Sequence, residues 1–197
     1  MRERKSKAAW VVAALAAAAA LLLGAAGCGQ YQPGEPFREP ADESFQSQAT
    51  PVEAVQKWLK SMEWKDRQNP DEGKDFDAFV EVSAPALFPE GTIADPEEMQ
   101  KLRDLWNSRD WEAEFKDLEF ETYPKEAENP DWEGDEATVR IVSGQVRYIG
   151  KEMFDTNEYK VESFKDKPGE VVLRKLDGKW RVMGARVIGD GDSWSVQ

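Results

Sequence analysis

The chain contains no histidine and a single cysteine among its 197 residues. The absence of histidine excludes histidine general bases, Ser-His-Asp and Cys-His catalysis, and every histidine-ligated zinc, copper or haem site. One cysteine excludes an internal disulfide and a cysteine-cluster metal site. Basic residues are also scarce, since 26 Lys and Arg face 39 Asp and Glu, giving a net charge of −13. Phosphate backbones repel a net anion, so we expect no nucleic-acid partner.

The first 27 residues have the composition of a secretory signal peptide. A basic leader of net charge +3 over residues 1–7 precedes an uninterrupted apolar run over 8–23, and small residues follow over 24–27. A basic region, an apolar region and a small-residue cleavage site are the three parts of such a signal. The sequence therefore predicts that residues 1–27 are removed and that the rest of the chain is extracytoplasmic.

Cys28 directly follows Ala25-Ala26-Gly27, and this junction resembles the lipobox of bacterial lipoproteins. The family usually carries Leu where this chain has Ala25. The resemblance implies cleavage between Gly27 and Cys28 and attachment of diacylglycerol to the Cys28 thiol. It also implies a location at the cell membrane, where the protein is lipid-anchored on the extracytoplasmic face and the membrane is its partner through the lipid on Cys28.

Two other interpretations of this segment stay open. Residues 8–26 nearly reach the ~20 apolar residues of a transmembrane helix, so an uncleaved signal-anchor is one alternative. An ordinary buried thiol at Cys28 is the other. A sole cysteine at the end of the apolar run, ahead of a polar Pro-rich stretch, favours lipid attachment. The lipoprotein and the signal-anchor both predict an extracytoplasmic domain held at a membrane.

The remainder divides into a tether, one globular domain and a short tail. Residues 28–49 hold the lipidated cysteine and a Pro-, Gln- and Ser-containing stretch without apolar periodicity, which is typical of a flexible linker. Residues 50–190 form the predicted domain, and residues 191–197 form the tail. Without the leader, 22 basic and 38 acidic residues give a net charge of −16. This acidity indicates a solvated surface that stays off anionic lipid headgroups.

Helical patterns occupy the first half of the domain. Thr50, Pro51 and Glu53 have the spacing of a helix N-cap, first-turn proline and capping box, and apolar residues then recur at helical spacing up to about residue 66. Phe76, Phe79, Val80 and Val82 suggest a short second helix that stops before Pro85, and a third follows the start signal at Asp95 and includes Trp106. We expect their apolar stripes to face the core.

From Trp111 the apolar period changes to two, which is typical of strands. The phase slips by one residue after Asp117, so we expect a β-bulge near Asp117–Leu118. Glu112 and Glu114 fall on the polar, outward side of this alternation. Further strands are expected over about 136–149, around Tyr159 and at 171–173. Asp177-Gly178 predicts a tight hairpin into a last strand that begins with Trp180. Consecutive strands predict an antiparallel sheet and an α+β fold class.

Three helices followed by meandering strands that end in Asp177-Gly178-Lys179-Trp180, with Val182 after them, resemble the nuclear transport factor 2-like superfamily. This superfamily includes SnoaL-like (polyketide-cyclase-like) and ketosteroid-isomerase-like domains and many bacterial lipoproteins. The resemblance covers about residues 50–188. It implies N-terminal helices packed on a curved antiparallel sheet, a cone with an apolar pocket, and it implies no single function, because the fold hosts enzymes, ligand binders and oligomerisation modules.

The polar residues are candidates for two kinds of chemistry, acid–base catalysis and calcium binding. Ketosteroid-isomerase-like catalysis needs a carboxylate base and an oxyanion donor, for which Tyr148 or Tyr159 qualifies, but no catalytic motif of the family falls on these positions. Residues 129–135 have the spacing that begins a calcium-binding EF-hand loop, yet the twelfth position is Arg140 in place of the bidentate Glu. We therefore predict no catalytic residues, no metal ligands and no cofactor, and read 129–135 as an acidic turn.

Aromatic residues are the remaining functional candidates. The expected apolar faces carry four candidate pocket or core aromatics: Trp58, Trp111, Tyr148 and Trp180. Trp132 and Trp194 lie in acidic, glycine-containing stretches and are expected to be exposed. The prediction is a non-catalytic ligand-binding or protein-interaction domain, with a small apolar ligand or an envelope protein as its partner. A small-molecule enzyme of the isomerase or cyclase type, using the same pocket, is the alternative, and a structural envelope component is a third reading.

Overall fold

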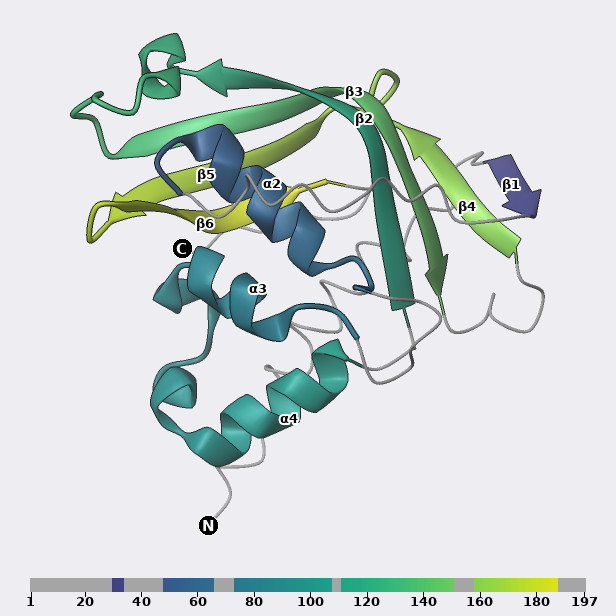
Figure 1. The fold of residues 1–197 in the computed structure, drawn as a ribbon, viewed down its shortest axis with the longest axis horizontal. Coiled ribbons are helices and arrows are strands. Elements are labelled where there is room, and N and C mark those ends of the chain that lie inside the picture. Colours follow the sequence, from purple (N-terminus) through teal and green to yellow (C-terminus); the bar gives the residue numbers. More distant parts are fainter. Residues whose placement is uncertain (1–29, 34–47, 66–72, 108–110, 151–157, 188–197) are drawn as a thin grey trace.

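The computed structural model describes residues 30–33, 48–65, 73–107, 111–150 and 158–187 (Figure 1). The expected signal peptide, Cys28, most of the tether, Trp194 and the C-terminal tail lie outside the described residues. Within the described ranges, no helix is long and apolar enough to cross a membrane.

The first half of the domain is helical, as its apolar periodicity predicts. Its α-helices are α2 (Pro51–Ser61), α3 (Phe76–Val82) and α4 (Pro96–Trp106). Three short 3₁₀ helices lie between or after them, namely η2 (Pro85–Leu87), η3 (Thr92–Ala94) and η4 (Lys125–Glu128).

Local capping explains where these helices begin. The Thr50 hydroxyl accepts from the Glu53 backbone N–H while the Glu53 carboxylate accepts from the Thr50 N–H, which confirms the predicted capping box. Asp95 caps α4 through its carboxylate, which accepts from the Glu97 and Glu98 backbone N–H groups. Helix α2 ends at Ser61, short of the expected residue 66, because the chain turns there and Trp64 pairs with Lys74 in an isolated antiparallel bridge.

The second half supplies five strands, and together with β1 near the N-terminus they form, among the described residues, one six-stranded sheet whose strand pairings are all antiparallel, so the predicted α+β class is confirmed. Its strands are β1 (Gln30–Pro33), β2 (Trp111–Tyr123), β3 (Glu136–Gly150), β4 (Glu158–Ser163), β5 (Gly169–Leu176) and β6 (Lys179–Arg186). Strand β2 pairs along one edge of β3, whereas β4 and β5 share the other edge. Beyond them lie β1, paired with β4, and β6, paired with β5. Strand β1 falls within the segment expected to be a tether.

The predicted β-bulge is present and marks a bend in the sheet. Lys116 pairs with Gln145 but Glu119 pairs with Ser143, so the register shifts across Asp117, which has φ +54°. Opposite it, Gly144 has φ +98°, and a Cβ there would lie 2.6 Å from the carbonyl oxygens of Lys116 and Asp117. Strands β2 and β3 bend sharply along their length (Figure 1), because a bulge increases local twist and curvature.

The helices cover one face of this bent sheet, and the core lies between them. Helix α2 packs against β2, β3 and β6, and α3 packs against α2 and β6. Helix α4 joins through Trp106, whose ring stacks on Phe79 with centroids 3.9 Å apart. The largest fully buried side chains come from both layers: Trp106, Trp180, Phe76, Phe164, Ile141, Leu173, Val55, Val82, Val139 and Val146.

The β5–β6 hairpin turns at Asp177 and Gly178, as predicted. Both residues have positive φ, +51° and +75°, the conformation of a two-residue type I′ turn whose twist matches the flanking strands. The turn places Trp180 on the helix-facing side of β6, where its side chain is 1% exposed.

Candidate functional site

The structure places two of the four candidate aromatics in detail. Trp180 is fully buried, and Trp58 is a half-buried side chain of α2 that packs against the same core cluster. Trp111 and Tyr148 lie in β2 and β3, where Tyr148 pairs with Ala113, but their side chains are outside the described part of the chain, as is that of Tyr159. The described candidates therefore belong to the core, as their apolar spacing predicts.

Trp58 has one feature that core packing leaves unexplained. Its indole Nε1 is buried, and no hydrogen-bond acceptor lies within reach of it in the described structure. An indole N–H is a donor only, and a buried one normally has a partner. Trp58 is therefore the described candidate able to give a hydrogen bond to a polar atom of an apolar ligand.

Trp180 is the centre of a small aromatic stack. Trp132, from the loop between η4 and β3, lies parallel to it with ring centroids 5.9 Å apart and 4° between the planes. The Lys175 ammonium group lies 5.9 Å from the centroid of the Trp180 ring and donates to the Trp132 carbonyl oxygen at 3.4 Å. The prediction that Trp132 is exposed is therefore wrong, because the acidic turn folds back onto the hairpin.

Gly134 explains why this stack forms. A Cβ at Gly134 would lie 2.2 Å from the Trp132 ring, so any larger residue at this position would push the ring out of the place that it occupies. Lys175 N–H also donates to the Asp135 carbonyl oxygen at 2.7 Å and holds the end of the loop against β5. Among the described residues, no group of three or more acidic or cysteine side chains is arranged to hold a metal ion.

The backbone of Trp180 is held from outside the sheet by Gln48. The Gln48 side-chain amide donates to the Trp180 carbonyl oxygen at 2.9 Å, and the Trp180 N–H donates to the Gln48 carbonyl oxygen at 3.2 Å. Gln48 is buried, so the folded unit begins at least two residues before the expected start at Thr50. Nothing in the polar sequence around residue 48 predicts this contact.

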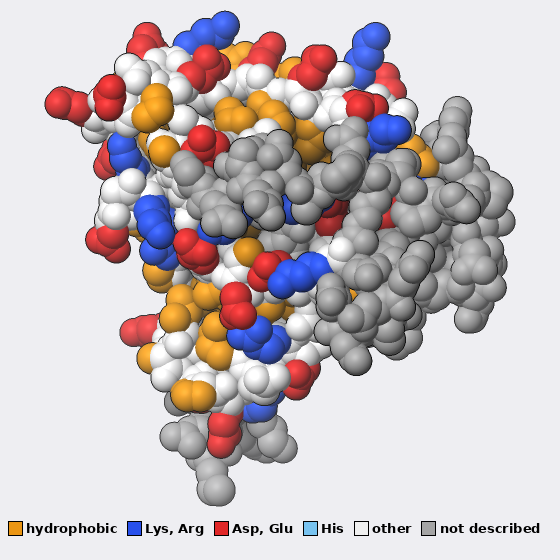
Figure 2. Space-filling view, viewed as in Figure 1, with side chains coloured by type: hydrophobic (Ala, Val, Ile, Leu, Met, Phe, Trp, Pro, Cys, Tyr) orange, Lys and Arg blue, Asp and Glu red, His pale blue; other side chains and the backbone are white. Residues whose placement is uncertain are grey.

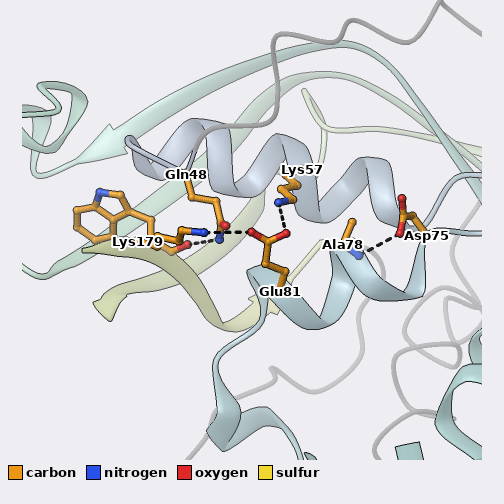
Figure 3. A network of polar contacts seen from close by, with 7 residues as sticks. Gln48, Lys57, Asp75, Ala78, Glu81 and Lys179 are labelled. Carbon is orange, nitrogen blue, oxygen red and sulfur yellow. Dashed lines mark hydrogen bonds and ion pairs between the residues drawn. The ribbon is translucent and has the colours of Figure 1, made fainter. Parts of the chain in front are cut away.

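A polar network links the helices to the start of β6 (Figure 3). The Glu81 carboxylate of α3 accepts from Lys57 Nζ of α2 at 2.6 Å and from Lys179 Nζ of β6 at 3.3 Å. The Lys57 hydrogen bond, supported by Lys179, holds the pKa of Glu81 below its ordinary value of 4.5. This carboxylate is ionised and occupied by two cations, which makes it a structural clamp and a poor general base.

A second ion pair holds α4 against α3. The Arg103 guanidinium contacts both carboxylate oxygens of Asp77, at 2.5 and 3.1 Å. This hydrogen bonding lowers the pKa of Asp77 from its ordinary value of 3.8. The Arg103 guanidinium also lies 4.9 Å from the centroid of the Phe76 ring. Around α3 and α4, apolar side chains gather on the visible surface, while charges of both signs are interspersed elsewhere (Figure 2).

Strands β2 and β3 carry buried charged residues that the sequence pattern does not predict. Glu112 and Glu114, expected on the outward side, are only 9% and 4% exposed, and Arg147 is 4% exposed. Glu114 lies directly opposite Arg147 in the ladder, so the two charges are cross-strand neighbours. Alternation correctly separates the two faces of the strand, but it does not tell which polar residues are covered by other parts of the chain.

Comparison of the chain with models of protein families, with curated proteins and with solved structures finds no match.

Proposed function

We propose that the chain is a lipoprotein, anchored through Cys28 on the extracytoplasmic face of the cell membrane, whose domain binds a ligand or a protein without catalysis. The support for the anchor is the sequence of residues 1–28, in which the sole cysteine follows a signal-like leader. The support for one compact domain behind the tether is the α+β fold of the described residues.

The domain is further proposed to be a nuclear transport factor 2-like cone. Three observations support this: the order of helices before strands, the antiparallel pairing, and the bend of β2 and β3 around α2. In such a cone, a pocket would lie between the helices and the concave face of the sheet, where Trp58 supplies its buried Nε1 donor.

The packing of aromatic rings in the interior is the observation that supports the non-catalytic part of the proposal. Phe79 contacts Phe76, Phe88 and Trp106 in one cluster, and Trp180 is covered by Trp132. These rings pack against one another, and phenyl and indole rings carry no acid–base group for catalysis. A binding or interaction role fits an interior that is built for packing.

The enzyme alternative has one observation in its favour. Glu112 and Glu114 are buried carboxylates, and a carboxylate is the residue type that such an enzyme would use as its base. Against it, Glu114 lies directly opposite Arg147, so a cation is its cross-strand neighbour. Loss of turnover in Glu112→Gln or in Glu114→Gln would identify an isomerase or cyclase.

Mass spectrometry of the protein from its own host tests the proposal. We expect an N-terminal peptide that begins at a Cys28 carrying at least two acyl chains, because one chain gives only marginal membrane binding. Cys28→Ser should abolish acylation and leave the leader uncleaved. An intact Met1 with a free Cys28 thiol would show a signal-anchor and refute the lipoprotein. Native spectra of the same sample report any retained small ligand.

A further inference from the structure

The outer face of the sheet, turned away from the helices, carries charges in ordered rows across the strands. Directly opposite residues share a face, and the register places four charged residues of alternating sign in one row: Glu121, Arg140, Glu170 and Arg186. A second charged row runs in parallel and ends differently, with two arginines side by side: Glu136, Arg174 and Arg181. The sign alternation is broken at Arg174 and Arg181.

These two arginines, the outer-face arginine pair, are placed to hold an anion. Directly opposite side chains have Cβ atoms about 4.5–5.5 Å apart, and like charges at that spacing destabilise a sheet. Arg174 contacts the Glu136 carboxylate, but Arg181 Nε is buried and has no hydrogen-bond acceptor among the described residues. Guanidinium groups bind carboxylates through paired N–H donors. Because Arg181 Nε is shielded from solvent, one oxyanion placed between the two arginines would meet their terminal N–H groups.

A row without charged residues lies between the two charged rows. It contains Tyr123, Thr138, Val172 and Gly184. Tyr123 and Val172 are each 44% exposed, and Val172 lies two residues before Arg174 on the same face. The Tyr123 hydroxyl is bound to Glu121 and its ring lies 5.4 Å from the Arg140 guanidinium carbon, so the tyrosine is held in place. An apolar side chain next to the bound anion would rest on Val172.

The composition of this face favours a protein partner over a membrane. Its rows hold four arginines and three glutamates, a net charge of +1, in a chain of net charge −13. Anionic bilayers attract clusters of four to eight basic residues, and the three interspersed carboxylates would face the headgroups. A single acidic side chain of a protein partner, in contrast, has to contact only the arginine pair.

We propose that the outer-face arginine pair binds an Asp or Glu side chain of a partner protein, with a neighbouring aliphatic side chain of that partner on Val172. This rests on the interaction role proposed above and names its surface. The surface lies on the opposite side of the sheet from the aromatic core, so binding there requires no opening of the core.

A peptide titration tests the site. The probe is the capped tripeptide acetyl-Leu-Glu-Val-amide, added to the full chain in detergent micelles and followed by NMR of the arginine Nε–Hε signals. We expect the Arg181 signal to shift and saturate in the millimolar range. Arg181→Gln should weaken binding about tenfold or more, which is a change of about 1.4 kcal/mol or more. The matched control Arg186→Gln, on an exposed arginine of the other charged row, should bind as the unaltered chain does.

Other outcomes would overturn the proposal. Equal binding of acetyl-Leu-Gln-Val-amide would show that no carboxylate is recognised. Binding to anionic phospholipid vesicles that Arg181→Gln abolishes, without a peptide response, would assign the face to the membrane. The two proposals fail separately: an unacylated Cys28 refutes the anchor and leaves the peptide response in place, whereas an absent response with an acylated Cys28 refutes only this site.

Discussion

Trp180 is the residue on which the described core most depends. It is fully buried, it stacks on Trp132, and its backbone is held by Gln48. Replacing it removes apolar contacts from the helices, from the β5–β6 hairpin and from the acidic loop at once. Its neighbour Lys175 stays beside the ring through the bond to the Trp132 carbonyl oxygen.

We therefore expect Trp180→Ala to lower the free energy of unfolding by roughly 3–5 kcal/mol, the usual cost of truncating a large buried aromatic side chain. Urea unfolding followed by circular dichroism measures this. Trp132→Ala is the matched comparison and should cost clearly less, because Trp132 is only half-buried. A midpoint for Trp180→Ala equal to that of the unaltered chain would show that the ring is not part of the core.

Single residues also show the limit of reading a sequence. The burial of Trp180 follows from the alternation after Asp177-Gly178, but that of Trp132 does not, because a loop that folds back leaves no periodic signal. The burial of Glu112 and Glu114 is missed as well, because the alternation of a strand does not report how deeply each face is buried. Local sequence patterns predict the face of a strand or helix on which a side chain lies, but they do not predict whether another part of the chain covers that face.

At the level of elements, the bulge between β2 and β3 determines the shape of the sheet. It pairs a left-handed Asp117 with a left-handed Gly144, and the glycine is required because two carbonyl oxygens lie where its Cβ would be. Gly178 also has positive φ, but no atom lies within 4 Å of the Cβ position there. Gly144 is therefore favoured both by its positive φ and by the backbone atoms close to it, whereas Gly178 is favoured by its positive φ alone.

Gly144→Ala should destabilise the protein more than Gly178→Ala. Both substitutions incur the cost of a left-handed L-residue, about 1–2 kcal/mol, and only Gly144→Ala adds a clash with backbone. Thermal unfolding of the two variants gives the comparison. Equal shifts of Tm would mean that the bulge relaxes freely and does not fix the bend.

Elements were the most predictable level of this fold. Thr50 with Glu53, and Asp95 with the following proline, mark helix starts because capping depends on residues within one turn. The phase slip at Asp117 revealed the bulge for a similar reason, since strand faces alternate residue by residue. The end of α2 at Ser61 was not predictable, because it depends on the bridge between Trp64 and Lys74.

For the molecule as a whole, ion pairs join the helices to one another and to the sheet. Glu81 joins α2, α3 and β6, and Asp77 joins α3 to α4. Both carboxyls have a pKa below the ordinary value in the folded protein. The stability that they contribute is complete above their ordinary pKa values, and it is lost as the pH falls through the lowered ones.

Stability should accordingly decrease as the pH is lowered below about 4, and added salt should reduce this dependence because both pairs reach the solvent. Glu81→Gln should flatten the acid limb of a plot of Tm against pH while lowering Tm only slightly at neutral pH. Glu90→Gln, at an exposed residue outside these pairs, is the control. If Tm falls at acid pH in Glu81→Gln as it does in the unaltered chain, protonation of Glu81 does not contribute to the pH dependence of folding.

The segments that flank α2 each bond to an edge strand of the sheet. Just before the helix, Gln48 bonds to Trp180 on the outer edge of β6; just after it, the Glu63 carboxylate accepts from the Phe115 N–H of β2 at 2.8 Å. Uncovered strand edges pair with other chains and start aggregation. The segments on either side of α2 therefore each satisfy a backbone group of an edge strand, and loss of these two contacts would leave the Phe115 N–H and the Trp180 backbone groups open to pairing with another chain.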